Sequence, residues 1–367
     1  MSLPQKTLPK IPRLQRALVA TGPGSLALKA VAVPRIAVDE VLVRTAAVAL
    51  NPSDHKLLDQ STTAGAISGS DFAGVVVHVG SSVQDRMSVG DRVFGIVFGA
   101  NPGRPGNGAF AQYVAAPADL CMHVPDGMDM ATAASMGMGL MTTGLALRSL
   151  GLRWDRLAEQ NDDSDDDRHN PYVLVHGGAT ATGTIAIQIL RQAGYLPVAT
   201  CSPTNFDLVT DRGAVAGFDY NSASCANDIR RYTKGRLHYA LDCIGNEATM
   251  ILCYCALGDG ASYYTTLEQY SRRLTIRRRD VTPDWILGWT LLGDEVQLAG
   301  AYYREARPDD RQFGRDWAVL MESLLEQARV RPHPIEATSQ GALMAVVPRL
   351  DLLRKKMVKG KKIVVKV

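Results

Sequence analysis

PYVLVHGGATATGTIAIQILRQAGYLPVATCSP, residues 171–203, is the stretch that decides the fold of this chain. Residues 172–175 form the short apolar run of a buried parallel strand, and glycines follow it directly. A helical pattern begins near Thr182 and stops at Gly194, and a second apolar run follows at residues 196–200. Glycines let a backbone approach a phosphate, and the amides of a helix N-terminus attract one. The unit therefore predicts a nucleotide site.

The glycine spacing departs from the usual G-x-G-x-x-G pattern, because Gly177, Gly178 and Gly183 enclose the letters A-T-A-T. On the pattern alone, a glycine-rich turn without a dinucleotide is the alternative interpretation. An NAD site usually places an acid after the second strand, where it binds the ribose 2′-hydroxyl. Here T-C-S-P-T-N, residues 200–205, offers hydroxyl and amide groups, and the nearest acid is Asp207. This segment favours NADPH over NADH, although it has no adjacent arginine.

The size and charge of the chain exclude several classes of function. A length of 367 residues suits two domains, and a net charge of +3 is too small to indicate a nucleic-acid partner. The six cysteines lack paired C-x-x-C spacings, so we expect buried, reduced thiols and no metal site. We find neither a secretory signal nor a run of about 18 apolar residues. We therefore expect a cytoplasmic protein without membrane contact.

An acidic run at residues 162–167 divides the chain into two compositions. We interpret the run itself as a solvated surface loop. After it, strand and helix patterns alternate, which predicts an α/β, doubly wound parallel sheet, and residues 362–367 read as a last strand that returns to the first domain. Before it, valine-rich runs separated by turn residues predict a small, mostly antiparallel β domain: residues 41–48, 74–80, 91–97 and 111–115.

The first half of the chain resembles the medium-chain dehydrogenase/reductase superfamily in AVALNPSDHK (residues 47–56), SGSDFAGVVVHVG (68–80), VGDRVFG (89–95) and GAFAQYV (108–114). The resemblance implies a GroES-like, β-rich catalytic domain over residues 1–160 and 300–367, and a Rossmann cofactor domain over residues 161–299. Zinc-dependent members carry an early cysteine, a G-H-E motif and a cluster of four cysteines. This chain has N-P-S-D at residues 51–54, G-S-D at residues 69–71 and no such cluster, which indicates a zinc-free member.

Within the zinc-free branch, the chain resembles fungal trans-acting enoyl reductases of the lovastatin-pathway type, in the strings VLVHGGATATGT, YLPVATCSPTNFDL, FDY and YALDCI. The resemblance implies reduction of an α,β-unsaturated thioester with NADPH as hydride donor. The substrate would be carried on the acyl carrier protein of an iterative highly reducing polyketide synthase or of a synthase–peptide synthetase hybrid. A zinc-free quinone or small-enone reductase and a non-catalytic NADPH-binding protein are the alternatives.

The same resemblance implies which residues line the site. For the cofactor it implies Pro52, Ser53, Asp54, His55, Ala179, Thr180, Ala181, Thr182, Ser202, Pro203, Thr204, Asn205, Tyr220, Leu267, Glu268, Met357 and Val358. Of these, residues 179–182 would receive the phosphates and residues 202–205 the 2′-phosphate. For the substrate it implies Thr143, Gly144, Leu145, Ala146, Leu147, Arg148, Ser149, Leu150, Trp289, Thr290, Leu291, Leu292 and Gly293. The letters M-V-K-G at residues 357–360 depart from the serine-glycine-lysine form often found there.

Enoyl reduction needs a hydride at the β-carbon, a stabilised charge on the thioester oxygen and a proton at the α-carbon. Lys56 and Thr142 are the catalytic candidates, because both lie in motifs expected at the nicotinamide cleft and each can donate to an oxygen. Alternatively, Lys56 binds ribose or is solvated, and Thr142 only caps or packs. Asp71 is expected to fix a turn, and neither His55 nor His176 has a partner that indicates acid–base work.

Two basic clusters are expected as solvated faces, and they are also candidate docking sites for an acidic carrier protein. Their members are Arg272, Arg273, Arg277, Arg278 and Arg279, and Lys355, Lys356, Lys359, Lys361 and Lys362. Residues 268–311 read as a charged insertion beside the edge of the parallel sheet, so we expect a monomer.

Overall fold

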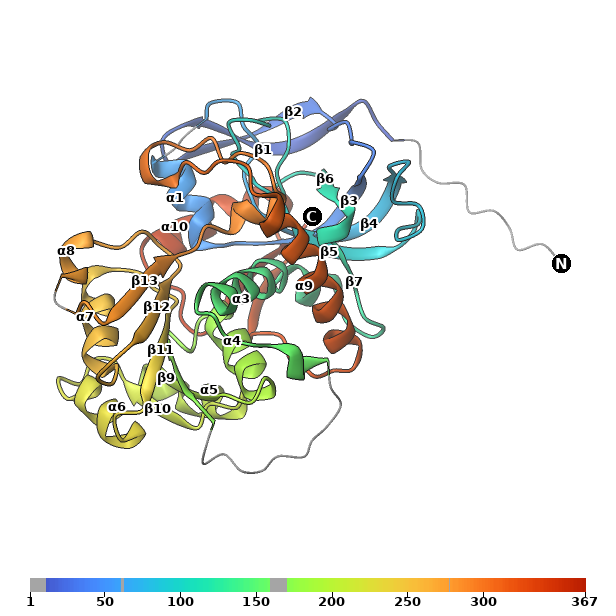
Figure 1. Cartoon of the computed structure of the whole chain (residues 1–367). Coiled ribbons are helices and arrows are strands. Elements are labelled where there is room, and N and C mark those ends of the chain that lie inside the picture. The colour runs from blue at the N-terminus through green and yellow to red at the C-terminus, as the bar shows by residue number, and fades with distance from the viewer. Residues whose placement is uncertain (1–10, 61–62, 159–169, 277) are drawn as a thin grey trace.

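The computed structural model describes residues 11–60, 63–158, 170–276 and 278–367 (Figure 1). Two sheets organise these residues, one parallel and one mixed, with helices between and around them. The acidic run at residues 162–167 and Arg277 lie outside the described residues. The predicted domain limits stay a prediction.

The six-stranded parallel sheet has the strand order β10-β9-β8-β11-β12-β13, which is the doubly wound order predicted from the sequence. Its strands are β8 (Tyr172–His176), β9 (Leu196–Cys201), β10 (Ala216–Asp219), β11 (Leu237–Asp242), β12 (Ser262–Thr266) and β13 (Val281–Trp285). The helices that connect them are α4 (Ala181–Gln192), α5 (Phe206–Asp211), α6 (Cys225–Thr233), α7 (Glu247–Ala256) and α8 (Arg272–Thr275). We call this part the parallel-sheet half.

β13 corrects the interpretation of residues 268–311 as an insertion beside the sheet. Val281–Trp285 is itself the edge strand, and it pairs in parallel with β12. The strand contains Pro283, which has no backbone N–H donor. Because proline is disfavoured in strands, the sequence pattern did not predict a strand here. An edge strand tolerates proline, because one side of its backbone has no partner strand.

The mixed sheet has the order β14-β15-β3-β4-β5-β7, and β6 pairs with β3. Its strands are β3 (Glu40–Ala49), β4 (Asp71–Val79), β5 (Arg92–Ile96), β6 (Tyr113–Pro117), β7 (Met122–His123), β14 (Ile335–Thr338) and β15 (Lys362–Lys366). A hairpin of β1 (Leu14–Gly22) and β2 (Ser25–Ala32) lies beside it. β15 runs antiparallel to β3, so the last strand returns to this mixed-sheet half, as predicted.

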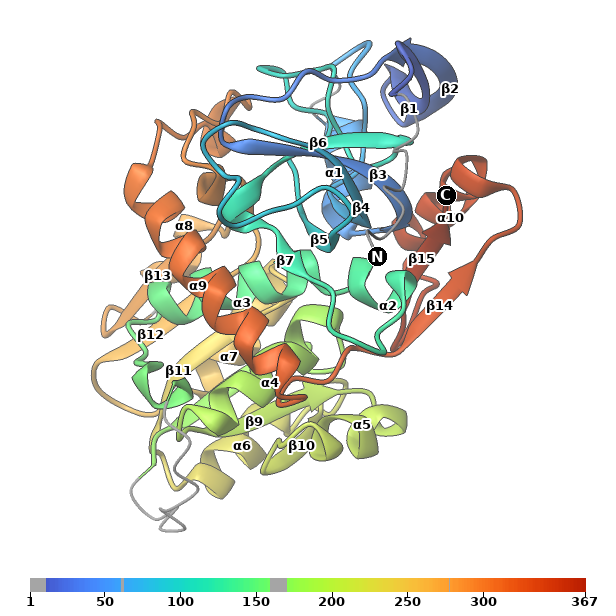
Figure 2. The same ribbon diagram turned by 90° about the vertical axis from the view of Figure 1, so that its right-hand side faces the viewer.

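Three helices fill the space between the two sheets (Figure 2). They are α2 (Met130–Ala134), α3 (Gly137–Ser149) and α9 (Pro308–Glu326), and the sequence analysis did not predict α9. Trp317 of α9 packs against Gly144, where a Cβ would lie 2.6 Å from the indole ring, and its Nε1 donates to the carbonyl of Leu140 at 2.9 Å. The large ring fits only because position 144 has no side chain.

The stretch Met130–Ser149 is, by length and composition, apolar enough to cross a membrane. In the fold, 78% of its most apolar window is buried, as in the core helix of a globular protein. The remaining short elements are α1 (Pro52–Gln60), α10 (Val346–Arg354), and the 3-10 turns η1 (Ala118–Leu120), η2 (Asp155–Leu157), η4 (Pro203–Asn205), η5 (Gly288–Leu292), η6 (Gly300–Tyr302) and η7 (Ala342–Ala345).

Candidate active site

The glycine turn between β8 and α4 is tight at each of its three glycines. Gly177 has a positive φ of +74°, which favours glycine. A Cβ on Gly178 would lie 2.8 Å from the Cβ of Ala199, and one on Gly183 would lie 2.4 Å from the carbonyl oxygen of Gly177. Because these three positions lack side chains, β8, the turn and α4 pack closely together, and the backbone of the turn reaches the surface.

Thr180 is the N-cap of α4, and its hydroxyl accepts from the amide of Gly183 at 3.0 Å. Among the described residues, nothing hydrogen-bonds to the amides of Ala179, Ala181 and Thr182. These amides lie at the positive end of a twelve-residue helix. The residues predicted for the phosphates thus present backbone donors of the kind that a pyrophosphate accepts from, and their role stays a prediction.

The segment after β9, predicted for the 2′-phosphate, lies beside Tyr220, another predicted cofactor residue. The Ser202 hydroxyl is 3.1 Å from the Tyr220 hydroxyl, and Pro203 and Thr204 are exposed in η4. Asn205 faces the loop before β15, because a Cβ on Gly360 would lie 3.0 Å from its Oδ1. That loop carries the exposed Met357 and the half-buried Val358. The structure therefore gathers these predicted cofactor residues around one end of the parallel sheet.

A pocket lies between α1, the end of β12 and the segment from β13 to η6. It brings together Ser53, Lys56, Leu267, Glu268 and Trp289, which were predicted separately for the cofactor, catalysis and the substrate. Leu267 and Glu268 directly follow β12, and the carboxyl ends of parallel strands are where ligands bind in such sheets. Its remaining lining residues, which the sequence analysis missed, are Leu57, Gln60, Trp285, Leu287, Leu298 and Tyr302.

Lys56 is held by an ion pair inside this pocket. Its Nζ contacts Oε2 of Glu268, and the Tyr302 hydroxyl donates to the other oxygen, Oε1. Burial opposes the charge on Glu268, but the hydrogen bonds from Lys56 and Tyr302 hold its pKa below the usual value. Burial and the bond to Glu268 together raise the pKa of Tyr302. The pocket thus holds an ammonium, a carboxylate and a phenol in one chain of contacts.

Thr142 lies on α3, buried, and is not a lining residue of this pocket. Met138, one helical turn earlier on the same face, packs against the apolar cluster of Leu57, Trp289 and Leu298 that forms the pocket wall. The structure therefore brings Met138, but not Thr142, to this wall. The neighbouring Thr143 hydroxyl donates to the carbonyl of Gly139 at 2.8 Å and is fully buried.

The predicted substrate residues of α3 are mostly part of the core. All of residues 143–150 are buried except Arg148 and Ser149. Arg148 pairs with Asp310 at 3.1 Å, and the Ser149 hydroxyl donates to Asp284 at 2.6 Å. In η5, the indole of Trp289 stacks on Phe98 with centroids 4.7 Å apart, and Thr290 and Leu291 are buried. Leu292 is half-buried, and Gly293 ends η5 with φ at +84°.

A buried polar cluster behind α1 was not predicted. Asp54 accepts from the amide of Asn51 at 2.7 Å and from the Ser70 hydroxyl at 2.8 Å. Desolvation raises the pKa of Asp54 to about 7. Asp71 accepts from Asn51 Nδ2 and from Lys362 Nζ, both at 2.9 Å, and from the amide of Met138 in the first turn of α3 at 2.6 Å. Asp71 therefore joins β4, α3 and β15 instead of fixing only a turn.

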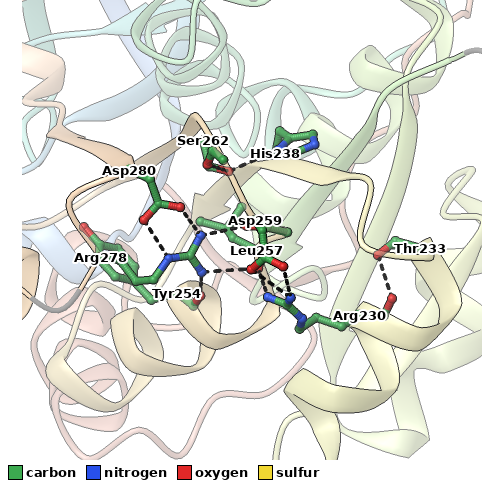
Figure 3. Close-up of polar contacts among 11 residues, drawn as sticks. Arg230, Thr233, His238, Tyr254, Leu257, Asp259, Ser262, Arg278 and Asp280 are labelled. Carbon is green, nitrogen blue, oxygen red and sulfur yellow. Dashed lines mark hydrogen bonds and ion pairs between the residues drawn. The ribbon is translucent and has the colours of Figure 1, made fainter.

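Two members of the predicted basic clusters are not on solvated faces. Lys362 is buried, with 6% of its side chain exposed, because it pairs with the fully buried Asp71. Arg278 binds Asp280 and donates to the carbonyls of Tyr254 and Gly258 at 3.0 and 2.7 Å (Figure 3). It thereby satisfies carbonyls at the end of α7. The other described members of the clusters, Arg272, Arg273, Arg279, Lys355, Lys356, Lys359 and Lys361, are exposed.

The histidines and cysteines near the site have structural surroundings. Burial lowers the pKa of His176, and its Nδ1 lies 2.7 Å from the Thr200 hydroxyl. Burial also lowers the pKa of His55, which lies 3.5 Å from Asp59, while Pro52 before it is exposed. Cys255 is exposed, against the expectation of six buried thiols. No group of three potential metal ligands is found among the residues that the structure describes.

Comparisons with known proteins show the family and the fold of the chain. The family model for the alcohol dehydrogenase GroES-like domain matches residues 37–126, which confirms the GroES-like fold predicted for the first half. The trans-enoyl reductase caaB of Aspergillus niger is 46% identical over 359 residues, covering 97% of this chain and 98% of the relative. A trans-enoyl reductase of Gibberella fujikuroi is 42% identical over 357 residues, covering 96% and 98%.

Two solved structures share the whole fold. A putative zinc-dependent alcohol dehydrogenase protein from Rhizobium etli aligns with a TM-score of 0.78 at 21% identity, covering 97% of this chain and 98% of that one. CurK enoyl reductase aligns with a TM-score of 0.73 at 17% identity, covering 96% and 99%. At these identities the likeness shows the fold alone.

Proposed function

The chain belongs to the trans-enoyl reductase family, and we propose that it reduces the α,β-double bond of a polyketide enoyl thioester with NADPH. It is an oxidoreductase that acts on C=C bonds with a nicotinamide cofactor. In our proposal, the thioester is carried on the acyl carrier protein of a partner, an iterative highly reducing polyketide synthase or a synthase–peptide synthetase hybrid. The chain would work in trans, in the cytoplasm.

The observation that carries the proposal is the composition of the pocket at the end of β12. Leu57, Trp289 and Leu298 give it an apolar wall, and Lys56 and Glu268 place charges at its side. An apolar wall suits an acyl chain, and a donor beside it suits a thioester oxygen. The pocket also adjoins the carboxyl ends of the parallel strands, where the residues predicted for the cofactor lie.

The chemistry asks the chain to position two reactants and to stabilise one developing charge. When bound, a nicotinamide cofactor supplies the hydride for the β-carbon of the enoyl thioester. Lys56 would donate from Nζ to the thioester oxygen as negative charge develops there. Thr142 does not line this pocket, so Lys56 alone is proposed as the donor to that oxygen. The apolar wall would exclude water and strengthen its interaction.

NADPH is proposed because of the groups around the predicted 2′-phosphate site. Ser202, Thr204, Asn205 and Tyr220 offer hydroxyl and amide donors, and the segment from Ser202 to Asn205 has no carboxylate that would repel a phosphate. The nearest acid, Asp207, is exposed in the first turn of α5. A preference for NADPH over NADH is the measurable consequence.

We also propose that the chain is a monomer. β13 is one edge of the parallel sheet and contains Pro283, which cannot donate to a strand of a second copy. The Arg304 guanidinium lies 4.2 Å over the ring of Trp285 at the end of the same strand. Sedimentation should give a single species near 39.6 kDa, and a stable dimer would contradict this proposal.

The deciding experiment follows NADPH oxidation with three acceptors: an enoyl-pantetheine thioester, the same enoyl group on an acyl carrier protein, and a simple quinone. We expect turnover of both thioesters, faster on the carrier, and faster with NADPH than with NADH. Turnover of the quinone alone would favour the quinone-reductase alternative. Tight NADPH binding without any turnover would favour the non-catalytic alternative.

A further inference from the structure

We propose that Glu268 and Tyr302 are positioning residues, which hold the Lys56 ammonium where it can donate to the thioester oxygen. The inference rests on the proposed function and deepens it, because it assigns the catalytic geometry of Lys56 to contacts made by two other segments. We refer to the three residues as the Lys56–Glu268–Tyr302 chain. Tyr302 is not among the site residues predicted from the sequence.

The Lys56–Glu268–Tyr302 chain joins three separate parts of the fold. Lys56 is in the middle of α1 in the mixed-sheet half, and Glu268 is the second residue after β12. Tyr302 is the last residue of η6. The lysine side chain is 38% exposed and the glutamate side chain 20%, so the contact lies at the edge of the pocket. A long, flexible lysine in such a place has many conformations unless a partner fixes it.

Glu268 is fixed by its backbone surroundings. Gly245 has a φ of +71°, and a Cβ there would lie 2.6 Å from the Cβ of Glu268, so the two loops are in close contact. The amide of Gln269 donates to Oε1 of Glu268 at 3.2 Å. Lys56 occupies Oε2, while Tyr302 and Gln269 share Oε1. The carboxylate is therefore oriented by donors on both of its oxygens.

Tyr302 is fixed by aromatic packing. Its ring meets Trp285 edge to face, with centroids 5.3 Å apart at an angle of 75°, and the Arg304 guanidinium lies over the Trp285 ring, 4.2 Å from its centroid. The hydroxyl of a ring packed in this way can reach only a small set of positions. Loss of the hydroxyl would leave Oε1 of Glu268 with only the donor from Gln269, while the aromatic contact stays in place.

The arrangement leaves donors on Lys56 for the reaction. An ammonium has three N–H donors, and the structure engages Nζ with Glu268. The remaining donors can serve a substrate or cofactor oxygen without breaking the ion pair. Glu268 and Tyr302 thus act through Lys56, and removing either one should disturb the direction of the ammonium while the charge stays present.

The test compares Tyr302→Phe with the matched control Tyr303→Phe. Tyr303 also donates to a glutamate, Glu295, at 2.7 Å, but on the exposed surface. We expect Tyr302→Phe to lower kcat/KM for the enoyl-pantetheine thioester about tenfold, because misplaced groups lose much of their effect. NADPH affinity should change less than kcat. Tyr303→Phe should match the wild type, and equal rates in the two variants would overturn the proposal.

A double-mutant cycle separates positioning from a general structural role. In a Lys56→Met background, Tyr302→Phe should have little further effect, because the group through which it acts is gone. A tenfold loss that persists in that background would refute the inference. If Tyr302→Phe does not fold, Glu268→Gln tests the same chain, with Glu295→Gln as its control.

A second readout does not depend on turnover. The acylation rate of each lysine by an amine-reactive reagent can be followed by peptide mass spectrometry. We expect Tyr302→Phe to raise the rate at Lys56 several-fold, with Lys355 unchanged as an internal reference, and Tyr303→Phe to leave both unchanged. Equal labelling of Lys56 in the two variants would contradict the positioning role. Failure of enoyl turnover in the wild type would instead count against the proposed function.

Discussion

The glycine turn and the Lys56 pocket differ in how the sequence determines them. The turn uses Gly177, Gly178, Thr180 and Gly183, which lie within one short segment. The pocket joins Lys56 to Glu268 across 212 positions, and the buried cluster behind it joins Lys362 to Asp71 across 291. The first site is therefore a property of local backbone geometry. The second exists only after the two halves of the chain have packed together.

The largest effect should come from breaking the buried ion pair between Lys362 and Asp71, which lies behind the Lys56 pocket. Lys362→Met leaves the fully buried Asp71 without its cation, and breaking one side of a buried ion pair lowers the free energy of unfolding by about 3–5 kcal/mol. Urea unfolding would measure the change. Lys366→Met, on the exposed end of the same strand, is the control and should change little. A loss below about 1 kcal/mol would mean that the pair is not essential for joining β15 to β4 and α3.

The glycine turn can be disrupted by adding a single methyl group. Gly183→Ala places a Cβ 2.4 Å from the carbonyl oxygen of Gly177, which is backbone and cannot rotate away. We expect a loss of about 2–3 kcal/mol in unfolding free energy, since such overpacking outweighs the better helix propensity of alanine. NADPH affinity should fall with it, by calorimetry. Gly106→Ala meets nothing within 4 Å and should leave both quantities unchanged.

This difference also explains what the sequence could predict. The doubly wound order followed from apolar runs and glycines that act locally, and the resemblance supplied the GroES-like half. The edge strand β13 was missed because Pro283 interrupts its pattern. Lys362 was read as part of a surface cluster, because sequence neighbours such as Lys361 are exposed while its partner Asp71 is distant. Tyr302 gave no signal, because its role depends on contacts with Glu268 and Trp285.

Asp54 makes the stability of the buried polar cluster at α1 sensitive to pH. Its pKa rises from 3.8 to about 7 on folding, so between these values the folded chain keeps a proton that the unfolded chain releases. Stability linked to this group is therefore greatest at low pH and is lost as the pH rises toward the folded pKa. Asp54→Asn keeps an acceptor for the amide of Asn51 and removes the titration.

The measurement is the difference in unfolding free energy between Asp54→Asn and the wild type. From about pH 5 to pH 8, it should move in favour of the variant by roughly 2–3 kcal/mol. Using the difference cancels the carboxylates with lowered pKa, such as Asp59, which act in the opposite direction. A difference that stays flat with pH would show that Asp54 is ionised in the folded chain throughout this range.

The smallest effect should come from the loop before β15, where the mixed-sheet half approaches the cofactor end of the parallel-sheet half. The loop before β15 approaches the predicted 2′-phosphate site at Asn205, and it carries Lys359 and Lys361 on either side of Gly360. Both lysines are exposed. Because exposed cations attract a phosphate weakly, replacing both with alanine should weaken NADPH binding by roughly threefold to tenfold and NADH binding less.

The control for the lysine pair is Lys29→Ala, which removes an exposed cation from β2 and should affect neither cofactor. The NADPH effect should also shrink as salt is added, since the charges are solvated. Equal losses for NADPH and NADH would place the lysines near the part that the two cofactors share. In that case the preference for the 2′-phosphate would depend on Ser202 and Tyr220. The cofactor end of the site, like the glycine turn, would then be built from residues close together in the sequence.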